Sequence, residues 1–245
     1  MDDPRVREDV SRFLVHLTKD DELEGAEDQL LSILSDRNIE ARNAYCLFSP
    51  LIKNSDFSPV LKNKFNTVCF TETPLPQIVS LLLDLPGRKV KLKPYGLVFW
   101  RRELVARGAN PAIYVNAMGK SNLKRYLLEQ FKQDFKDVKT FKTFRQQECY
   151  FQELIHYYSL ITVMSTSHDF AWEREWRVLG DFRFLYRDLV AIIAKDPEKF
   201  LTRCEKTLTR SAMGLIRRTP MISPYWNYEE ILEEMSMLLW RNKET

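Results

Sequence analysis

Short apolar runs alternate with amphipathic stretches along the whole chain. The apolar runs predict strands, because they are rich in β-branched and aromatic residues and stop at turn residues. They cover Phe13–Thr18, Asn66–Glu72, Tyr95–Trp100, Ala112–Val115, Trp176–Leu179 and Val190–Ile193. Helical spacing of apolar residues covers Leu30–Leu34, Ile78–Leu83, Arg101–Arg107, Phe151–Tyr158, Asp196–Leu208 and Tyr228–Leu239. Since strands and helices do not alternate regularly, the pattern favours an α+β fold over a doubly wound one.

Cap and turn residues add local detail to this pattern. Asp2-Asp3-Pro4 predicts a helix that starts at the first residues, and Asp196-Pro197 predicts the start of a later one. Gly180-Asp181 predicts a hairpin turn that would pair Trp176–Leu179 with Phe182–Phe184.

One domain over residues 1–245 is expected, because no repeat, low-complexity tract or Gly/Ser linker marks a boundary. We expect a mixed, split β-sheet flanked by helices, with His16 near its middle. A basic helical insertion is expected around residues 120–145. A C-terminal amphipathic helix is expected around residues 227–242, with one apolar face made of Tyr228, Ile231, Leu232, Met235, Leu238 and Leu239.

The composition is that of an ordinary globular protein, with 44% hydrophobic and 29% charged residues. The net charge of +3 does not by itself imply a nucleic-acid partner. Acidic residues at the start and the lack of a long apolar run argue against a secretory signal or membrane anchor, so we expect a cytoplasmic protein. The four cysteines form no CxxC pair and lie apart from His16, His156 and His168, so no metal site is expected.

The sequence contains no Walker, GxGxxG, GxSxG or HExxH signature. The remaining candidates for a functional site are four short motifs at predicted strand ends. They are His16-Leu17-Thr18, Cys69-Phe70-Thr71-Glu72, Tyr95-Gly96-Leu97-Val98-Phe99 and Trp172-Glu173-Arg174-Glu175-Trp176-Arg177. Taken in order, with Ala109–Val115 between the third and the fourth, they resemble the AbiGi family of bacterial abortive-infection, or phage-resistance, proteins. The resemblance runs from about Phe13 to Ile193 and implies a paired system with a second defence protein as partner.

The same motifs are similar, more distantly, to DarT-like members of the ADP-ribosyltransferase fold. Proteins of that group bind NAD in the cleft of a split sheet without a Rossmann fingerprint. The resemblance therefore implies NAD as substrate, no metal, Glu175 as the catalytic carboxylate, and Tyr95 as a group that stacks on nicotinamide. This chain departs from the pattern, since none of its tyrosines is a convincing match to the Tyr-x-Ser element of that group.

The chemistry of such a site explains why these residue types are needed. Breaking the nicotinamide–ribose bond builds positive charge on the sugar, and a fixed carboxylate stabilises that charge. A histidine and a hydroxyl two residues apart on a strand share a face and can hold the ribose and amide. We therefore expect Glu175 and His16 as catalytic residues, and His16, Thr18 and Tyr95 as NAD-binding residues, in one concave site.

Structural roles for the same residues stay open. Glu175 could pair with Arg174 or Arg177 and hold the strand end. His16 could be a core histidine, and Thr18 a hydroxyl that caps a strand end.

The segment from Lys120 to Arg145 combines basic residues with interleaved aromatic ones, a pattern that suits a nucleic-acid backbone and its bases. Binding would use Lys124, Lys132, Lys136 and Lys139. The alternative is an amphipathic helix whose aromatic residues pack inward, which the spacing of Phe131 and Phe135 favours.

Two functions follow from the sequence, and it leaves open whether the chain is an enzyme. The first is an anti-phage effector that transfers ADP-ribose from NAD. The second is a catalytically inactive regulatory or antitoxin-like partner of a toxic protein in a two-component defence system.

Overall fold

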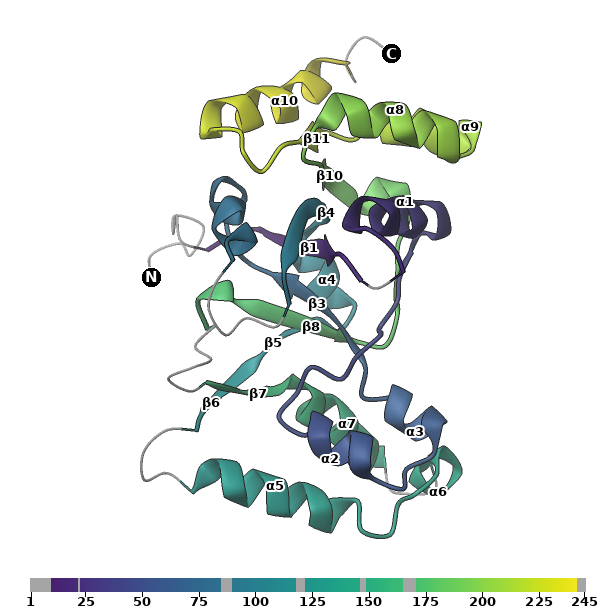
Figure 1. Cartoon of the computed structure of the whole chain (residues 1–245), viewed down its shortest axis with the longest axis vertical. Helices are drawn as coiled ribbons and strands as arrows, with labels where there is room; N and C mark the ends of the chain where they lie inside the picture. The colour runs from purple at the N-terminus through teal and green to yellow at the C-terminus, as the bar shows by residue number, and fades with distance from the viewer. Residues whose placement is uncertain are drawn as a thin grey trace. The chain divides into compact units, whose positions relative to one another are not determined.

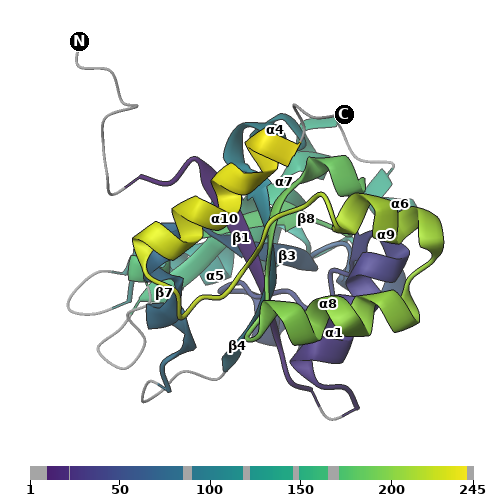
Figure 2. The same cartoon turned by 90° about the horizontal axis from the view of Figure 1, so that it is seen from above.

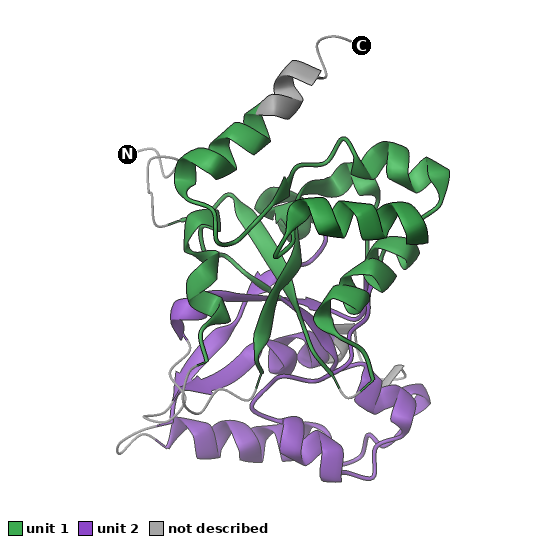
Figure 3. Ribbon diagram, turned by 45° about the horizontal axis from the view of Figure 1, so that its top comes forward, with its two compact units in different colours: residues 1–38, 70–106, 183–245 green, residues 39–69, 107–182 purple. Residues whose placement is uncertain are grey.

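The structure is a computed structural model that describes residues 10–21, 23–84, 90–117, 122–145, 149–164 and 171–241. These residues form two compact units (Figure 3): unit 1 holds residues 1–38, 70–106 and 183–245, and unit 2 holds residues 39–69 and 107–182. Neither unit is one contiguous stretch of sequence, and the expected single domain stays a prediction. The helix start expected at Asp2–Pro4 and the side chain of His168 lie outside the described residues.

A mixed sheet forms the centre of unit 1, and its neighbouring strands follow the order β11-β10-β4-β1-β3 (Figure 1). The strands are β1 (Phe13–Lys19), β3 (Thr67–Thr71, of which the last two residues belong to unit 1), β4 (Leu92–Trp100), β10 (Leu189–Ile193) and β11 (Met221–Ile222). β1 pairs antiparallel with β4, and β10 pairs parallel with β11. The α+β class is therefore confirmed, and so is the expected place of His16 in an inner strand.

The helices of unit 1 largely follow the predicted periodicity. They are α1 (Ala26–Asp36), η2 (Leu75–Leu82), α4 (Arg101–Ala106), η4 (Tyr186–Asp188), α8 (Pro197–Thr207), α9 (Arg210–Ile216) and α10 (Tyr228–Arg241). The predicted cap of α8 is confirmed, since the Asp196 side chain accepts a hydrogen bond from the backbone N–H of Lys199. The helix expected after Pro74 is instead a 3₁₀ helix, in which the Gln77 N–H donates to the Pro74 carbonyl, three residues back.

One face of this sheet is covered by η2 and α10. Their buried residues pack with those of the strands in a cluster of Val15, Leu17, Leu75, Ile78, Leu81, Val98, Ala191, Ile193, Ile222 and Ile231. The predicted apolar face of α10 is too wide, because Tyr228 and Leu232 are 63% and 51% exposed. Among the described side chains of α10, those of Ile231 and Met235 contact the cluster, and the side chains of Leu238 and Leu239 lie outside the described residues.

Unit 2 contains short strands and an aromatic core. Its strands are β5 (Asn110–Pro111), β6 (Ile113–Asn116), β7 (Ile161–Met164), β8 (Glu175–Leu179) and the residues Thr67–Cys69 of β3, which neighbour β8. β5 pairs antiparallel with β8, whereas β6 pairs parallel with β7. Its helices are α2 (Ser49–Asn54), α3 (Pro59–Asn63), α5 (Leu123–Asp134), α6 (Phe141–Arg145), α7 (Cys149–Leu160) and η3 (Ala171–Glu173).

The hairpin expected at Gly180-Asp181 is wrong. The residues after the turn form β9 (Phe182–Arg183), which pairs with β2 (Asn38–Ile39) and not with β8. The turn residues are held elsewhere, because the Gly180 N–H donates to the Asn66 carbonyl and the Asp181 carboxylate accepts from the Ala41 N–H. These long-range bonds outweigh the local turn preference.

A glycine allows the close approach of β1 and β4 in unit 1. Gly96 lies opposite Leu17, and a Cβ at position 96 would overlap the His16 carbonyl oxygen. Because a paired backbone cannot move aside like a flexible side chain, Gly96→Ala should lower the free energy of unfolding by about 2 kcal/mol, measured by urea unfolding. Gly214→Ala on α9 is the control, since open space surrounds its Cβ and alanine favours a helix by about 0.8 kcal/mol. Unchanged stability of Gly96→Ala would contradict the close approach.

Candidate functional site

The predicted catalytic and NAD-binding residues fall into both units. His16 and Thr18 lie on β1 and Tyr95 lies on β4, all in unit 1, whereas Glu175 is the first residue of β8 in unit 2. The meeting of these residues in one concave site stays a prediction.

Thr18 is buried, and its hydroxyl contacts backbone oxygens. The Oγ1 atom lies 2.8 Å from the Ala26 carbonyl and 3.1 Å from the Tyr95 carbonyl, and it can donate to either. A threonine has a single hydroxyl hydrogen, so these two acceptors compete for it and only lone pairs are left for a ligand. The position therefore joins β1 to the start of α1 and to β4.

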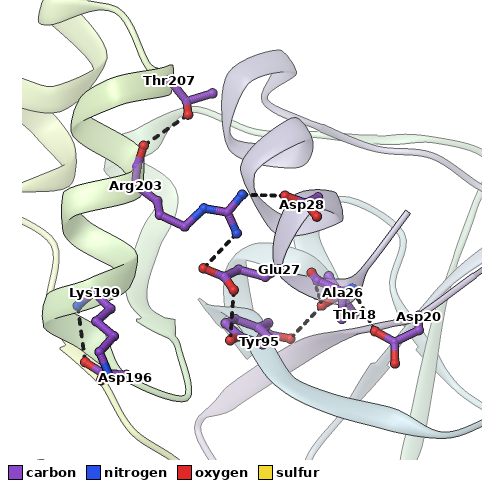
Figure 4. A network of polar contacts seen from close by, with 10 residues as sticks. All are labelled: Thr18, Asp20, Ala26, Glu27, Asp28, Tyr95, Asp196, Lys199, Arg203 and Thr207. Atoms are coloured by element: carbon purple, nitrogen blue, oxygen red, sulfur yellow. Dashed lines mark hydrogen bonds and ion pairs between the residues drawn. The ribbon is translucent and has the colours of Figure 1, made fainter. Parts of the chain in front are cut away.

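Tyr95 belongs to a polar network that joins β4, α1 and α8 (Figure 4). Its hydroxyl donates to Glu27 Oε2 at 3.2 Å, and Arg203 of α8 pairs with both Glu27 and Asp28 of α1. Figure 2 shows α1 and α8 lying side by side, as these ion pairs require. Burial, followed by the negative charge of Glu27, raises the pKa of Tyr95 to about 12.

His16 lies half-buried on the sheet face opposite Val15 and Leu17. Its ring contacts the ring of Phe70 edge-on, with 5.8 Å between the centroids, and Phe70 in turn contacts Phe99. These neighbours are aromatic, which favours the core-histidine interpretation for this side chain.

Glu175 forms a bidentate ion pair with Arg177. The Arg177 Nε and Nη2 atoms donate to the two carboxylate oxygens at 3.0 and 2.8 Å. The remaining Nη1 donates to the Ser159 carbonyl at 2.7 Å, near the end of α7. The Arg177 side chain is 2% exposed and that of Glu175 is 21% exposed, so the pair is largely withdrawn from water. The pairing that the sequence left open is therefore present.

Two further ionisable groups lie beside this pair. Burial, followed by the charge of Glu175, raises the pKa of the Cys69 thiol, which also hydrogen-bonds to the Glu175 carboxylate. Burial and the same charge raise the pKa of Tyr114, whose hydroxyl oxygen accepts from the Glu175 backbone N–H. For Arg177, burial is the largest effect and acts to lower the pKa, but Glu175, Cys69 and Cys46 together outweigh it and the pKa is raised. We call these four residues the Glu175 cluster; near neutral pH its thiol and phenol stay protonated.

Backbone strain and a histidine border the Glu175 cluster. The φ angle of Arg174 is 47°, in the left-handed region, which is costly for a residue with a Cβ. The His156 Nε2 atom lies 3.5 Å from the Asn110 Nδ2 atom, and Asn110 stands opposite Arg177 in the β5–β8 pair. Sequence reasoning missed Tyr114, because it stands in an ordinary apolar strand and reaches Glu175 only through tertiary structure.

No family model, curated protein or solved structure matches this chain. Within the described ranges, no helix is long and apolar enough to cross a membrane. The same part of the chain holds no group of three or more His, Cys, Asp or Glu side chains placed to hold a metal ion.

Removing the charge of Glu175 should destabilise the protein. Glu175→Gln leaves the guanidinium of Arg177 buried without a counter-charge, so the free energy of unfolding should fall by about 3 kcal/mol in urea unfolding. The matched control is Glu40→Gln, which breaks a pair with Arg42 whose side chains are 61% and 54% exposed, and should cost less than about 1 kcal/mol. Equal losses of the free energy of unfolding in the two variants would show that the buried pair contributes no more to stability than an exposed one.

The Tyr95 hydroxyl should make stability depend on pH in the alkaline range. The folded protein keeps this proton to about pH 12, whereas the unfolded chain loses it near pH 10, so the contribution is present below pH 10 and lost as pH rises through 12. The stability difference between the wild type and Tyr95→Phe should therefore shrink between about pH 10 and about pH 12 in urea unfolding. Tyr225→Phe, at an exposed position, is the control and should show no such change.

Proposed function

We propose that this chain is a bacterial phage-defence protein that acts by binding, as the regulatory or antitoxin-like member of a two-protein system. The ordered motifs that resemble the AbiGi family support the defence role. Three of them stand at strand ends in the structure: His16–Thr18 near the end of β1, Cys69–Glu72 across the end of β3, and Glu175 at the start of β8. The paired organisation of that family supports a role through a second protein.

The observation that carries the binding role is the bidentate contact between Glu175 and Arg177. A carboxylate that stabilises a developing positive charge on a sugar must present negative potential to it. Here the guanidinium of Arg177 already balances that charge, and moving it away would leave an unpaired buried cation. The pair favours a structural role for Glu175, which joins the start of β8 to the end of α7 through Arg177 and Ser159.

The second candidate function is an NAD-dependent ADP-ribosyltransferase effector on a split, ADP-ribosyltransferase-like sheet. It is favoured by the partial exposure of the Glu175 carboxylate, by Tyr114 beside it, and by the strained backbone of Arg174. In this candidate NAD is the substrate, and His16, Thr18 and Tyr95 hold it. Both candidates place the protein in the cytoplasm.

A double variant separates the two candidates. Glu175→Gln alone changes charge and stability together, whereas Glu175→Gln with Arg177→Met also removes the buried cation and should recover part of the lost stability. If the protein acts by binding, the double variant should protect cells from phage better than the single variant, in proportion to its cellular abundance. Plaque counts in cells that also carry the genes flanking this one, with the protein level measured by immunoblot, give the comparison.

Purified wild-type protein should leave NAD intact and transfer no ADP-ribose to DNA, RNA or cell protein. NAD turnover by the wild type, lost by orders of magnitude in a double variant that folds and accumulates normally, would reject the binding role and establish the transferase. Glu40→Gln serves again as the control for a lost carboxylate and should behave as the wild type in both assays.

A further inference from the structure

Positive charge is unevenly divided between the two units. Unit 2 contains fifteen Lys and Arg against eleven Asp and Glu, whereas unit 1 contains twenty-two against twenty-three. The small excess of the whole chain therefore belongs to unit 2. Charge that is concentrated on one part of a protein acts on partners more strongly than the net value indicates.

Helix α5 buries an apolar face and leaves its lysine and arginine side chains exposed. Leu127, Phe131 and Phe135 are buried at a spacing of four residues and pack into the core of unit 2. Phe131 stacks on Phe48 with 4.8 Å between the ring centroids. The inward packing of Phe131 and Phe135 confirms, for these two residues, the alternative of an amphipathic helix whose aromatic residues pack inward. Neither ring is therefore available to a nucleotide base.

Most cations of this region have no acidic partner. Lys132 pairs with Glu129 and Lys139 pairs with Asp56, both at exposed positions where such pairs are weak. Further cations form no ion pair within the part of the chain that the structure describes: Lys53, Lys62, Lys64, Lys124, Arg125, Lys136 and Lys142. We call these seven residues the basic surface of unit 2.

Side-chain contacts bring part of the basic surface together from separate helices. The Lys62 ammonium donates to the Lys53 carbonyl, which links α3 to α2. The Lys64 ammonium lies 4.8 Å from the centre of the Phe141 ring, next to Lys142 on α6. Figure 1 shows α2, α3, α5 and α6 gathered at one end of unit 2. The cations therefore form a field over several elements and not along one helix alone.

An aromatic side chain accompanies these cations on α5. Tyr126 is 62% exposed and stands directly after Arg125. One helical turn before it is Asn122, whose exposed amide can hydrogen-bond to a base edge, whereas the Gln130 amide one turn after it already donates to Asp134. Exposed cations together with an exposed ring and an amide are the combination used by proteins that bind single strands, where phosphates contact lysine and arginine and bases stack on rings.

We propose that unit 2 binds single-stranded nucleic acid on its basic surface, with phosphates on Lys124, Arg125, Lys136 and Lys142 and a base stacked on Tyr126. The exposed ring favours a nucleic acid over an acidic peptide, which would use the cations alone. This inference does not rest on the proposed function, because neither Glu175 nor NAD takes part in it.

The test is fluorescence anisotropy with labelled single-stranded RNA and DNA of mixed sequence, over about 50 to 200 mM salt. The triple variant Arg125→Gln, Lys136→Gln, Lys142→Gln should bind at least tenfold more weakly at low salt, and the slope of log affinity against log salt should fall by about 2. Tyr126→Ala should weaken binding by roughly tenfold with little change in that slope. The matched control removes three exposed cations of unit 1, Lys206→Gln, Arg210→Gln and Arg218→Gln, and should leave affinity unchanged.

Contrary outcomes would overturn the proposal. One is equal loss of affinity in the unit 1 control, which would mean that only overall charge matters. Another is an unchanged affinity of Tyr126→Ala together with equal binding of inorganic polyphosphate, which has no bases. Binding to an acidic peptide but to neither oligonucleotide would assign the surface to a protein partner. A stronger signal with RNA than with DNA, or the reverse, would support the proposal and name the type of strand.

Discussion

The burial of the Arg177 guanidinium is the constraint on which the core of unit 2 depends. A cation with 2% exposure needs a counter-charge and acceptors for its N–H groups, and Glu175 and the Ser159 carbonyl supply them. This requirement fixes the first residues of β8 against the end of α7. It also sets the electrical environment of Cys69 and Tyr114, which stay protonated beside a carboxylate whose charge is already balanced. Because Glu175 serves as the counter-charge of Arg177, this pairing limits the functions that Glu175 can have.

The polar contacts of unit 1 are weaker and more exposed than the Glu175–Arg177 pair of unit 2. Arg203 joins α8 to α1 through Glu27 and Asp28, but its side chain is 44% exposed, so water competes for each contact. Thr18 and Tyr95 complete the connection to the sheet with single hydrogen bonds. The stability of this unit must therefore come mainly from the apolar cluster between the strands and the helices η2 and α10. The polar network helps to orient the helices of this unit, which packing already holds in place.

Local sequence signals predicted the features that local physics determines. β1, β10 and the Asp196 cap of α8 follow from apolar runs and from one side chain near its own helix. The partner of β9 could not be predicted in this way, because the pairing of β9 with β2 depends on contacts between residues that are far apart in the sequence. The same limit holds at the candidate site, where the sequence indicated Glu175 and left its pairing open. It gave no sign of Tyr114, because no local spacing relates that residue to the β8 strand.

The segment around α5 shows how one amphipathic pattern can serve stability and recognition together. The rings of Phe131 and Phe135 supply apolar area to the core, so the helix is anchored without help from its lysines. The exposed cations on the other side then contribute little to folding, since a solvated lysine gains almost nothing from a distant carboxylate. Charge on that face can change without loss of the fold. The proposed binding of single-stranded nucleic acid would use such a surface, since a partner of opposite charge is attracted by cations that stability does not require.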